Sequence, residues 1–569
     1  MREEKTRKQN QVGDVLQNQH ITASFPIRNC SHATMDEIAS LPLHVKQVRI
    51  VTLEEKYKQL QHLDPEIASL FRNILDAIAM SKHEITSQSD DHNIMELSKK
   101  DIEALVEMRL ISRVMKGTPN YRVFSTPETH KGRRRWISHT PSTNEIEKIL
   151  VAADMKHNSS QFPKETLAQA AGQQLERATA TYGCCFDFAG YFTQFGLGAE
   201  FHLWHFRDGN HIYRLNTIPT GASFCPALAQ LFSVAILRHL KRKYRNFKYD
   251  VYIDNVRMVC EDKAYLCQVL TSLYALCDEL GVTINEKLQD LINSDMESYE
   301  FLGVMYDHKK HTTCLGGKML RKIQDLDVTG LKNTTLREYL RVYGSLTYAS
   351  GIVRLCRGTF YHATKFLRRQ VGTGLDEQVR PWTGSLRELQ HWRAALLAAP
   401  ALTHLMAQAG QPWNKAVLFT DASDHGIVSV LFRLDGTTSI IAGRWTKDES
   451  NLHINCKEAL VVKKALTSLD LRHLVALDLK IDNTSALFTI RSGTSKSHKL
   501  NEIVCDIWKV PEYSLIRSIE YVASDKNHAD LPSRLRRTLH IESRDPTTLC
   551  RLGYLAQMMN RDDCAVASH

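Results

Sequence analysis

The sequence predicts an α+β, multidomain protein. The chain has 569 residues, which is more than one hydrophobic core normally organises. Two separate regions, at about 180–310 and 409–540, alternate short apolar strand patterns with helical patterns. Strands interleaved with helices in this way favour a sheet that carries helices on one face. A mostly helical stretch, from 315 to about 408, lies between these two regions.

Individual segments support this division. In the first region the expected strands are CCFDF, DVYIDNVRMV and YEFLGVMYD, and the expected helices are CPALAQLFSVAILRHLKRK and YLCQVLTSLYALCDEL. The second region has the strands AVLFTDAS, SVLFRL and DLKIDN and the helix INCKEALVVKKALTSL. Helical patterns also cover LDPEIASLFRNILDAIAM, KKDIEALVEMRLISRV and LRELQHWRAALLAA. After about residue 540 no pattern is clear.

Composition narrows the class of protein. Hydrophobic residues make up 43% and charged residues 24%, as in soluble globular proteins. The net charge of +10 is a mild excess that favours polyanionic partners. The 13 cysteines are scattered without zinc-site spacing, which indicates reduced thiols in an intracellular protein, cytoplasmic or nuclear. MREEKTRKQNQ is no secretory signal and AALLAAPALTHLMA is too short to span a bilayer, so no membrane role is expected.

Two aspartates occupy apolar strands in the first region. Asp187 lies in CCFDF and Asp254 in VYIDN. A single aspartate in such a place is typical of a strand end or a turn. A buried carboxylate is costly unless it is paired or binds a cation. Two converging carboxylates suit a pair of Mg²⁺ ions ~4 Å apart, which is the chemistry of phosphoryl transfer.

These segments resemble successive motifs of reverse transcriptases, in the family's order. KGRRRWISHTPSTN is similar to the fingers segment that meets the incoming triphosphate, and its spacing to Asn144 makes Arg135 the matching arginine. Lys131 is the second candidate there. In FDFAGYF, Phe192 falls at the family's aromatic gate, which leaves no room for a 2′-hydroxyl; the alternative is a plain core aromatic.

Three further motifs extend the resemblance. IPTGASFCPALAQLF resembles the segment beneath template and nucleotide, which implies nucleotide contacts for Thr220 and Gly221. YIDN is similar to the tyrosine-x-Asp-Asp hairpin, and FLG to the primer grip. GVTINEK resembles the motif whose lysine protonates pyrophosphate; Lys287 is that lysine or an exposed loop residue. The resemblance implies a right-hand polymerase with fingers, palm and thumb, and Asp187 and Asp254 as its metal ligands.

One position departs from the family. Asn255 stands where most reverse transcriptases have a second aspartate. An amide oxygen still coordinates a cation, but a unit charge at 4 Å is worth at most ~4 kcal/mol in a surface-like medium. We therefore expect a polymerase that is weakened or differently metal-dependent, with Mn²⁺ as an alternative to Mg²⁺.

The second region carries four carboxylates. Asp421 lies in LFTDASDHG, Glu458 in INCKEAL, Asp482 in LKIDNTSAL and Asp530 in KNHADLPSRL. Each alone suits ordinary turn or helix capping. Together they resemble the Asp-Glu-Asp-Asp quartet of RNase H, which implies two Mg²⁺ ions and hydrolysis of the RNA strand of an RNA–DNA hybrid. Many relatives have a mobile histidine several residues before the last aspartate. The candidates here are His528, two residues before Asp530, and His498, much further back, and neither is a clear match.

The resemblance assigns domains to the chain. Residues 1–95 form an N-terminal extension without an assigned role, 96–312 the fingers and palm, 313–408 a helical thumb or connection, 409–540 RNase H and 541–569 a tail. TDASDHG, INCKEAL and NHADLPSR look most like DIRS-type retrotransposons that use a tyrosine recombinase, with trypanosomatid VIPER elements closest in character. This implies RNA template, DNA primer, RNA–DNA hybrid and deoxynucleoside triphosphates as partners, with a separate recombinase and Gag-like protein.

Three functions stay open from the sequence. The first is a bifunctional reverse transcriptase and RNase H. The second, motivated by Asn255, is an active RNase H beside a vestigial polymerase that clamps nucleic acid. The third is a non-catalytic nucleic-acid-binding scaffold, for which the basic runs KRKYR and RLRR speak, although such runs are usually solvated helix faces.

Overall fold

The chain forms two compact units in the computed structural model. One comprises 1–159, 189–229 and 281–283, and the other 160–188, 230–280 and 284–569. No helix in the described part of the chain is both long and apolar enough to cross a bilayer. The structure describes residues 39–80, 96–119, 121–128, 131–139, 177–199, 204–222, 224–403, 415–530 and 539–543.

The first unit combines short helices with three small sheets. Its helices are α3 (Leu53–Leu63), α4 (Pro65–Met80) and α5 (Lys99–Glu107), and η3 (Tyr191–Gln194) is a single 3₁₀ turn. One sheet has the order β1-β5-β4, a second β3-β9-β8, and β2 pairs with β7. The strands are β1 (Leu43–His44), β2 (Val51–Thr52), β3 (Ile111–Val114), β4 (Arg122–Glu128), β5 (Arg133–His139), β7 (Phe195–Gly196), β8 (His205–Asp208) and β9 (His211–Leu215).

Helix α5 is shorter than the sequence pattern predicts. Ser98 caps its start in a capping box with Asp101, and the helix ends at Glu107. Arg109 then adopts a left-handed φ of 59°, and Ile111–Val114 pairs with β9. The prediction of one continuous helix was therefore wrong at its end, because strand pairing overrides helical periodicity for the β-branched residues there.

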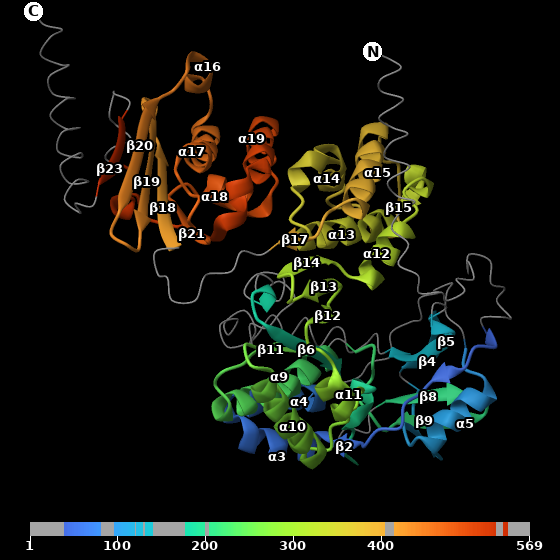
Figure 1. Cartoon of the computed structure of the whole chain (residues 1–569). Coiled ribbons are helices and arrows are strands. Elements are labelled where there is room, and N and C mark those ends of the chain that lie inside the picture. The colour runs from blue at the N-terminus through green and yellow to red at the C-terminus, as the bar shows by residue number, and fades with distance from the viewer. Residues whose placement is uncertain are drawn as a thin grey trace, which may run out of the picture. The chain divides into compact units, whose positions relative to one another are not determined.

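The second unit begins with a three-stranded antiparallel sheet. Its order is β10 (Lys248–Tyr252), β11 (Asn255–Cys260) and β6 (Tyr182–Asp187). Figure 1 shows α9 (Cys225–Lys243) and α10 (Lys263–Glu279) on one side of it. On the other side of the sheet, buried Arg257 lies between the rings of Phe301 and Tyr306. Its Cζ atom is 4.7 Å from each ring centroid. Successive side chains of β11 point to opposite faces of the sheet, so the apolar residues face the helices and Arg257 faces the other side.

A second small sheet and a helical layer follow. The sheet has the order β12 (Ser298–Phe301), β13 (Val304–Asp307), β14 (Thr312–Leu315) and β17 (Leu402–Thr403). Helices α12 (Gly317–Gln324), α13 (Leu336–Ile352), α14 (Tyr361–Arg368) and α15 (Thr383–Leu397) share one apolar core. Trp392 stacks on Phe360 at its centre, with ring centroids 4.5 Å apart. Short α11 (Leu288–Asn293) and the pair β15 (Thr334–Thr335) and β16 (Gln378–Val379) complete this part.

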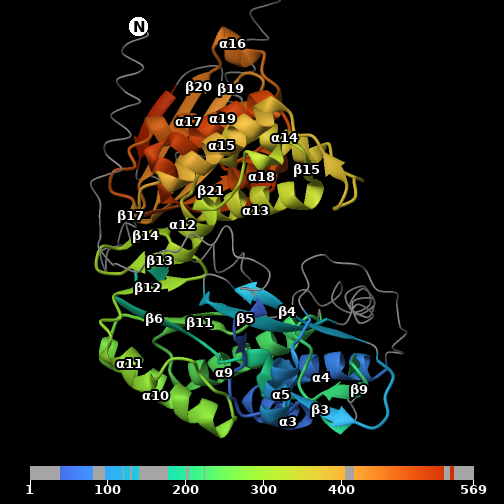
Figure 2. The same ribbon diagram turned by 90° about the vertical axis from the view of Figure 1, so that its right-hand side faces the viewer.

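A six-stranded sheet dominates the C-terminal part. Its order is β22-β21-β18-β19-β20-β23, from β18 (Lys415–Ala422), β19 (Gly426–Arg433), β20 (Thr438–Arg444), β21 (Ala476–Ile481), β22 (Ile516–Tyr521) and β23 (Leu539–Ser543). Helices α17 (Ile454–Ser468), α18 (Thr484–Ser492) and α19 (His498–Lys509) cover one face, as Figures 1 and 2 show, and α16 (Lys447–Ser450) precedes them.

The apolar cluster on the opposite face of this sheet is smaller. Phe419 and Phe432 pack there around Val428, Val430 and Ala529. Strand β23 pairs with β20 although the sequence shows no clear pattern after about residue 540. Five residues are too few for periodicity to separate a strand from a loop, so only the tertiary pairing defines this strand.

Buried His308 yields a prediction about acid stability. Its Nδ1 lies 2.8 Å from the carbonyl oxygen of Ala180, which only accepts, so Nδ1 carries the proton and Nε2 accepts from the Tyr299 hydroxyl at 3.3 Å. Burial lowers the pKa of His308 from its ordinary 6.5 to about 4. A depressed folded-state pKa contributes stability above ~6.5 that is lost as the pH falls towards ~4, up to about 3 kcal/mol here.

We therefore expect His308→Asn to flatten the fall in unfolding free energy between pH ~7 and ~4. Urea denaturation at several pH values measures this slope. His391, exposed on α15, gives the matched control His391→Asn, which should keep the parent slope. Equal slopes for parent and His308→Asn would contradict the assignment.

Candidate active sites

The first site lies at the end of the β6-β11-β10 sheet. Asp187 is the last residue of β6 and pairs across the ladder with Asn255, the first residue of β11. Asp254 belongs to the two-residue turn that joins β10 to β11, since Tyr252 pairs with Asn255. Antiparallel partners have Cα atoms ~4.5–5.5 Å apart, so register alone brings Asp187 beside the turn that carries Asp254.

The turn is strained and held from outside. Ile253 has a φ of 58°, which is unfavourable for a β-branched residue and costs roughly 1–2 kcal/mol. Two buried residues of α9 fix it. The backbone N–H of Ile253 donates to Gln230 Oε1 at 2.6 Å, and Ser233 Oγ donates to the Ile253 carbonyl at 2.6 Å. Helix α9 thereby determines where Asp254 stands.

Each aspartate receives a hydrogen bond from an asparagine amide. Asn255 Nδ2 donates to Asp254 Oδ1 at 2.9 Å. Asn285 Nδ2 donates to both carboxylate oxygens of Asp187, at 3.1 and 3.0 Å. Asn255 therefore acts as a donor to its neighbour, a role that an ionised aspartate at this position does not fill.

Glu286 adds a third carboxylate that the sequence analysis missed. Its Oε2 accepts from the backbone N–H of Asp187 at 3.0 Å. Burial, supplemented by the nearby charge of Asp187, raises the pKa of Glu286. The motif GVTINEK drew attention only to Lys287, which is exposed at the N-cap of α11. No signal in the sequence points to Glu286, because only the pairing of Ile284 with Phe188 brings this segment to the end of β6.

The remaining expected nucleotide contacts lie in the first unit. Arg135 is exposed on β5, and Lys131 Nζ lies 3.6 Å from Glu128. Phe192 is half-buried in η3. Thr220 and Gly221 belong to one loop that is bonded to Ser138 of β5.

Three contacts make that attachment. The backbone N–H of Thr220 donates to Ser138 Oγ at 2.8 Å, and Thr220 Oγ1 accepts from the Ser138 N–H at 3.1 Å. The N–H of Gly221 donates to the Ser138 carbonyl at 2.8 Å. The structure thus brings the Thr220–Gly221 loop to the strand that carries Arg135. Asn144, which anchors the motif spacing, lies outside the described residues.

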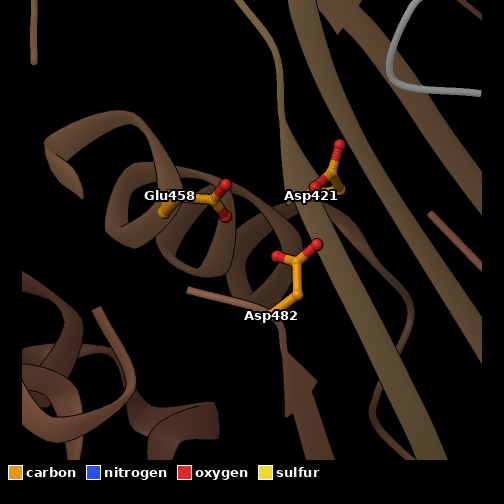
Figure 3. Close-up of side chains that lie close together, drawn as sticks. All are labelled: Asp421, Glu458 and Asp482. Atoms are coloured by element: carbon orange, nitrogen blue, oxygen red, sulfur yellow. The ribbon is translucent and has the colours of Figure 1, made fainter. Parts of the chain in front are cut away.

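The second site is a cluster of three carboxylates from three elements. Asp421 comes from β18, Glu458 from α17, and Asp482 directly follows β21. Their ligand atoms lie within 4.8 Å of one another. Figure 3 shows the three carboxyl groups pointing toward one another. Among the described residues, this is the one group of three or more possible ligands at such spacing.

The cluster is electrostatically unfavourable without a cation. Asp421 and Glu458 are 5% and 4% exposed. Burial, with the charges of Asp421 and Asp482, raises the pKa of Glu458 to about 9. Glu458 Oε2 is buried without a hydrogen-bond partner. An orphaned carboxylate oxygen among two others is the donor set that Mg²⁺ prefers, so these residues fit such an ion.

The fourth expected carboxylate lies on a different segment. Asp530 begins a helical turn, where its N–H donates to the Asn527 carbonyl at 3.0 Å, and it is not a member of the three-residue cluster. His528 packs its ring on Phe419 and Phe432, at centroid distances of 4.8 and 5.2 Å. His498 opens α19, 3.4 Å from Glu502.

One family of known proteins matches the part of the chain that carries the first site. Residues 126–306 match the family described as "Reverse transcriptase (RNA-dependent DNA polymerase)". This stretch includes Asp187, Asp254 and Glu286. Over this stretch the chain is similar to reverse transcriptases, and the predicted α+β, multidomain fold is confirmed as reverse-transcriptase-like. No curated protein sequence matches the chain.

Solved structures of a foamy viral protease-reverse transcriptase are also similar. The form called dRH, in complex with double-stranded DNA, shares 15% identity with a TM-score of 0.45, over 84% of this chain and 83% of that one. A complex with RNA/DNA hybrid gives 15% and 0.42, over 84% and 64%. Another complex with double-stranded DNA gives 15% and 0.43, over 84% and 99%.

The carboxylate cluster predicts an unusual response to neutralisation. The raised pKa of Glu458 means that the folded state becomes less stable as the pH rises from 4.5 towards about 9. At pH ~7 the cost amounts to as much as ~3 kcal/mol. Glu458→Gln should therefore raise the unfolding free energy in a metal chelator, while added Mg²⁺ should stabilise the parent more than the variant.

Thermal and urea denaturation in chelator and in Mg²⁺, from pH ~5 to ~8.5, measure both effects. Glu502, exposed on α19, gives the control Glu502→Gln, for which little change is expected. A Glu458→Gln protein that is less stable than the parent in chelator, and equally stabilised by Mg²⁺, would show that the cluster binds no cation.

Proposed function

We propose that this chain is the reverse transcriptase of a retroelement, with an RNase H activity that degrades the RNA strand of RNA–DNA hybrids. The observation that carries this proposal is the presence of two carboxylate sites on one chain. The first lies on the hairpin of a reverse transcriptase domain. The second is a buried triad between a sheet and a helix.

In the polymerase site, Asp187 and Asp254 would hold two Mg²⁺ ions. When bound, such ions neutralise phosphate charge and lower the pKa of a 3′-hydroxyl. The chain's own contribution is positioning. Asn285 fixes the Asp187 carboxylate through two hydrogen bonds, and α9 fixes the turn of Asp254. Lys287 is exposed beside them, as a proton donor to pyrophosphate would be.

The nucleotide pocket is assigned to residues of the first unit. Arg135 and Lys131 would meet the triphosphate, and the loop of Thr220 and Gly221 would lie beneath the nucleotide. Phe192 would exclude a 2′-hydroxyl by its bulk. Support comes from the family match over these positions and from the attachment of the Thr220–Gly221 loop to the strand of Arg135.

In the nuclease site, Asp421, Glu458 and Asp482 would hold Mg²⁺ ions, with Asp530 completing the set. A bound pair of ions supplies an activated water and charge neutralisation for hydrolysis. The triad supplies three anionic oxygens in a largely buried place. Buried Asn527 ties the segment of Asp530 to β18, since its Nδ2 donates to the Thr420 carbonyl at 3.1 Å. The substrate proposed for this site is the hybrid that polymerisation makes.

A second candidate function follows from Asn255. If the hydrogen bond from Asn255 to Asp254 persists when cations bind, the palm lacks one anionic ligand, and the polymerase half serves only as a clamp beside an active RNase H. The carboxylate count argues against this candidate, because Glu286 brings a third negative group to Asp187. A non-catalytic scaffold leaves the triad unexplained.

The class of element is part of the proposal. The motifs TDASDHG, INCKEAL and NHADLPSR support a DIRS-type retrotransposon of the VIPER kind. Template RNA, primer DNA and deoxynucleoside triphosphates are the partners that this implies, together with a recombinase and a Gag-like protein from the same element. An intracellular place, in cytoplasm or nucleus, belongs to the same proposal.

The two activities should separate by mutation. Asp187→Asn should lower primer extension on an RNA template by at least ~100-fold, equal to ~2.7 kcal/mol of transition-state stabilisation, and leave hybrid cleavage intact. Asp421→Asn should do the reverse. Both reactions are measured on one labelled substrate. Exposed aspartates give the controls Asp290→Asn and Asp448→Asn, which should change neither reaction.

Absence of extension by the parent under any metal condition, with cleavage retained, would favour the clamp. Absence of both reactions would leave only the scaffold. Cleavage that survives Asp421→Asn undiminished would mean that the nuclease site is misassigned.

The charge at position 255 should tune the metal requirement. Asn255→Asp adds a carboxylate beside Asp254 and removes a donor, so cations should bind more tightly. We expect half-maximal extension at a several-fold lower Mg²⁺ concentration and a smaller advantage of Mn²⁺. Asn293→Asp makes the same charge change on α11, where Asn293 is exposed, and should not alter the titration. Identical Mg²⁺ titrations for parent and Asn255→Asp would contradict this role.

A further inference from the structure

A cavity of about 590 Å³ lies at the edge of the six-stranded sheet, away from the carboxylate cluster's own side chains. Its walls come from α18, the end of α19, the edge strand β22 and Arg354 after α13. The volume is in the range of ligand-binding pockets. Neither proposed activity uses this cavity.

Positive charge dominates the lining. The lining contains three arginines, Arg354, Arg491 and Arg517, and one carboxylate, Glu520. Glu520 forms an ion pair with Lys480 Nζ at 2.5 Å. Arg354 and Arg517 have backbone carbonyls as hydrogen-bond partners, those of Ser514 at 3.4 Å and Val475 at 2.8 Å. The side chain of Arg491 makes no hydrogen bond or ion pair with the described residues. Asp478 acts on Arg517 and Arg491 acts on Glu520 through their charges, but none of the three guanidinium groups forms an ion pair with a carboxylate among the described residues.

Two of these guanidinium groups lie where their charged form is disfavoured. Burial lowers the pKa of Arg354. Burial, and next the charge of Arg354, lowers the pKa of Arg517 to about 10. Arg354 also has a left-handed φ of 52°, a conformation that costs a non-glycine residue free energy. An anion in the cavity would relieve the repulsion between these groups.

Aromatic side chains accompany the arginines. Phe488 and Tyr521 are 64% and 57% exposed, which is unusual for such rings. Trp508 and Tyr513 lie against each other, with centroids 4.9 Å apart. Both donate to the Ile490 carbonyl, at 2.8 and 3.2 Å, which fixes this wall of the cavity. A rigid aromatic wall next to exposed rings offers stacking surfaces for a planar group.

We propose that this cavity binds one nucleotide unit of a single-stranded nucleic acid, with phosphate on the arginines and base against Phe488 or Tyr521. Cationic groups that follow the backbone, together with aromatic rings for the bases, are the chemistry by which proteins hold single strands. Arginine suits phosphate because its donors form a planar fork. A paired duplex hides its base faces from such rings.

Helix α18 connects the triad to the cavity, because it begins just after Asp482 and carries Arg491 of the cavity wall. The helix begins at Thr484, two residues after Asp482, and Arg491 lies about two turns further, ~10 Å along the axis. That distance equals roughly three phosphates of one strand in a duplex. A strand that leaves the triad unpaired and follows α18 would reach Arg491 within a few nucleotides. Binding there does not require that the triad cuts, so the inference is independent of the proposed nuclease activity.

The test is photo-cross-linking of the full chain to an oligothymidylate ~12 nucleotides long that carries photoreactive bases, followed by peptide mapping. We expect cross-links in peptides that contain Phe488 or Tyr521. Joint Phe488→Ala and Tyr521→Ala substitution should lower this yield roughly tenfold. Arg491→Ala should lower the salt dependence of binding by about one unit of slope. These exposed side chains are removable without a loss of core packing.

Matched controls come from the same domain. Leu434 is 59% exposed and Arg472 has an 83% exposed side chain, so Leu434→Ala and Arg472→Ala should leave cross-linking and salt dependence unchanged. Binding of a blunt primer-template duplex should be equal in all variants. The inference is wrong if cross-links map elsewhere, or if the pocket variants match the controls. Displacement of the cross-link by an acidic peptide at equal concentration would assign the cavity to a protein partner instead.

Discussion

Strand register is the constraint on which both carboxylate sites depend. In the palm, the antiparallel ladder pairs Asp187 with Asn255, and this pairing sets Asp254 beside Asp187. In the C-terminal sheet, parallel pairing of Thr420 with Ile481 brings the next residues of both strands, Asp421 and Asp482, to the same edge. A slip of one residue would turn every side chain to the other face. The apolar packing that sets the register of the two sheets therefore also sets the positions of the carboxylates.

The two sites reduce the repulsion among their carboxylates differently. In the palm, amide donors from Asn255 and Asn285 reach the aspartates. In the triad, Glu458 Oε2 accepts no hydrogen bond from the described residues, and burial raises the pKa of this residue instead. The adjacent Lys457 bonds to Asp424, 3.3 Å away, rather than to the triad. The palm is thus stabilised by its own donors, whereas the triad depends on protonation or on a cation.

Much of the fold follows from local sequence patterns. The apolar runs of α9, α10 and α17 are long enough for periodicity to define them, and the strands that carry Asp187 and Asp421 are flanked by clear turns. What the sequence does not reveal is long-range pairing. Glu286 contacts Asp187 from 99 positions away, and the strain at Ile253 exists because α9 holds the turn. Strand β3 was mistaken for helix because its partner strand β9 is similarly distant from it along the sequence.

The same limit applies to charge. Asn255 reads as a lost ligand when the hairpin is considered alone, yet the palm retains three carboxylates because the segment of Glu286 pairs with the end of β6. One oxygen of Glu286 accepts from the backbone N–H of Asp187, so this carboxyl group is held close to Asp187. The palm therefore has its anionic charge shifted from position 255 toward Asp187. Asp187 and Glu286 would supply two carboxylates to a bound cation, whereas the turn would supply Asp254 together with an amide. The departure at Asn255 thus affects the two expected cation positions unequally, which makes metal preference a more sensitive property of this palm than activity alone.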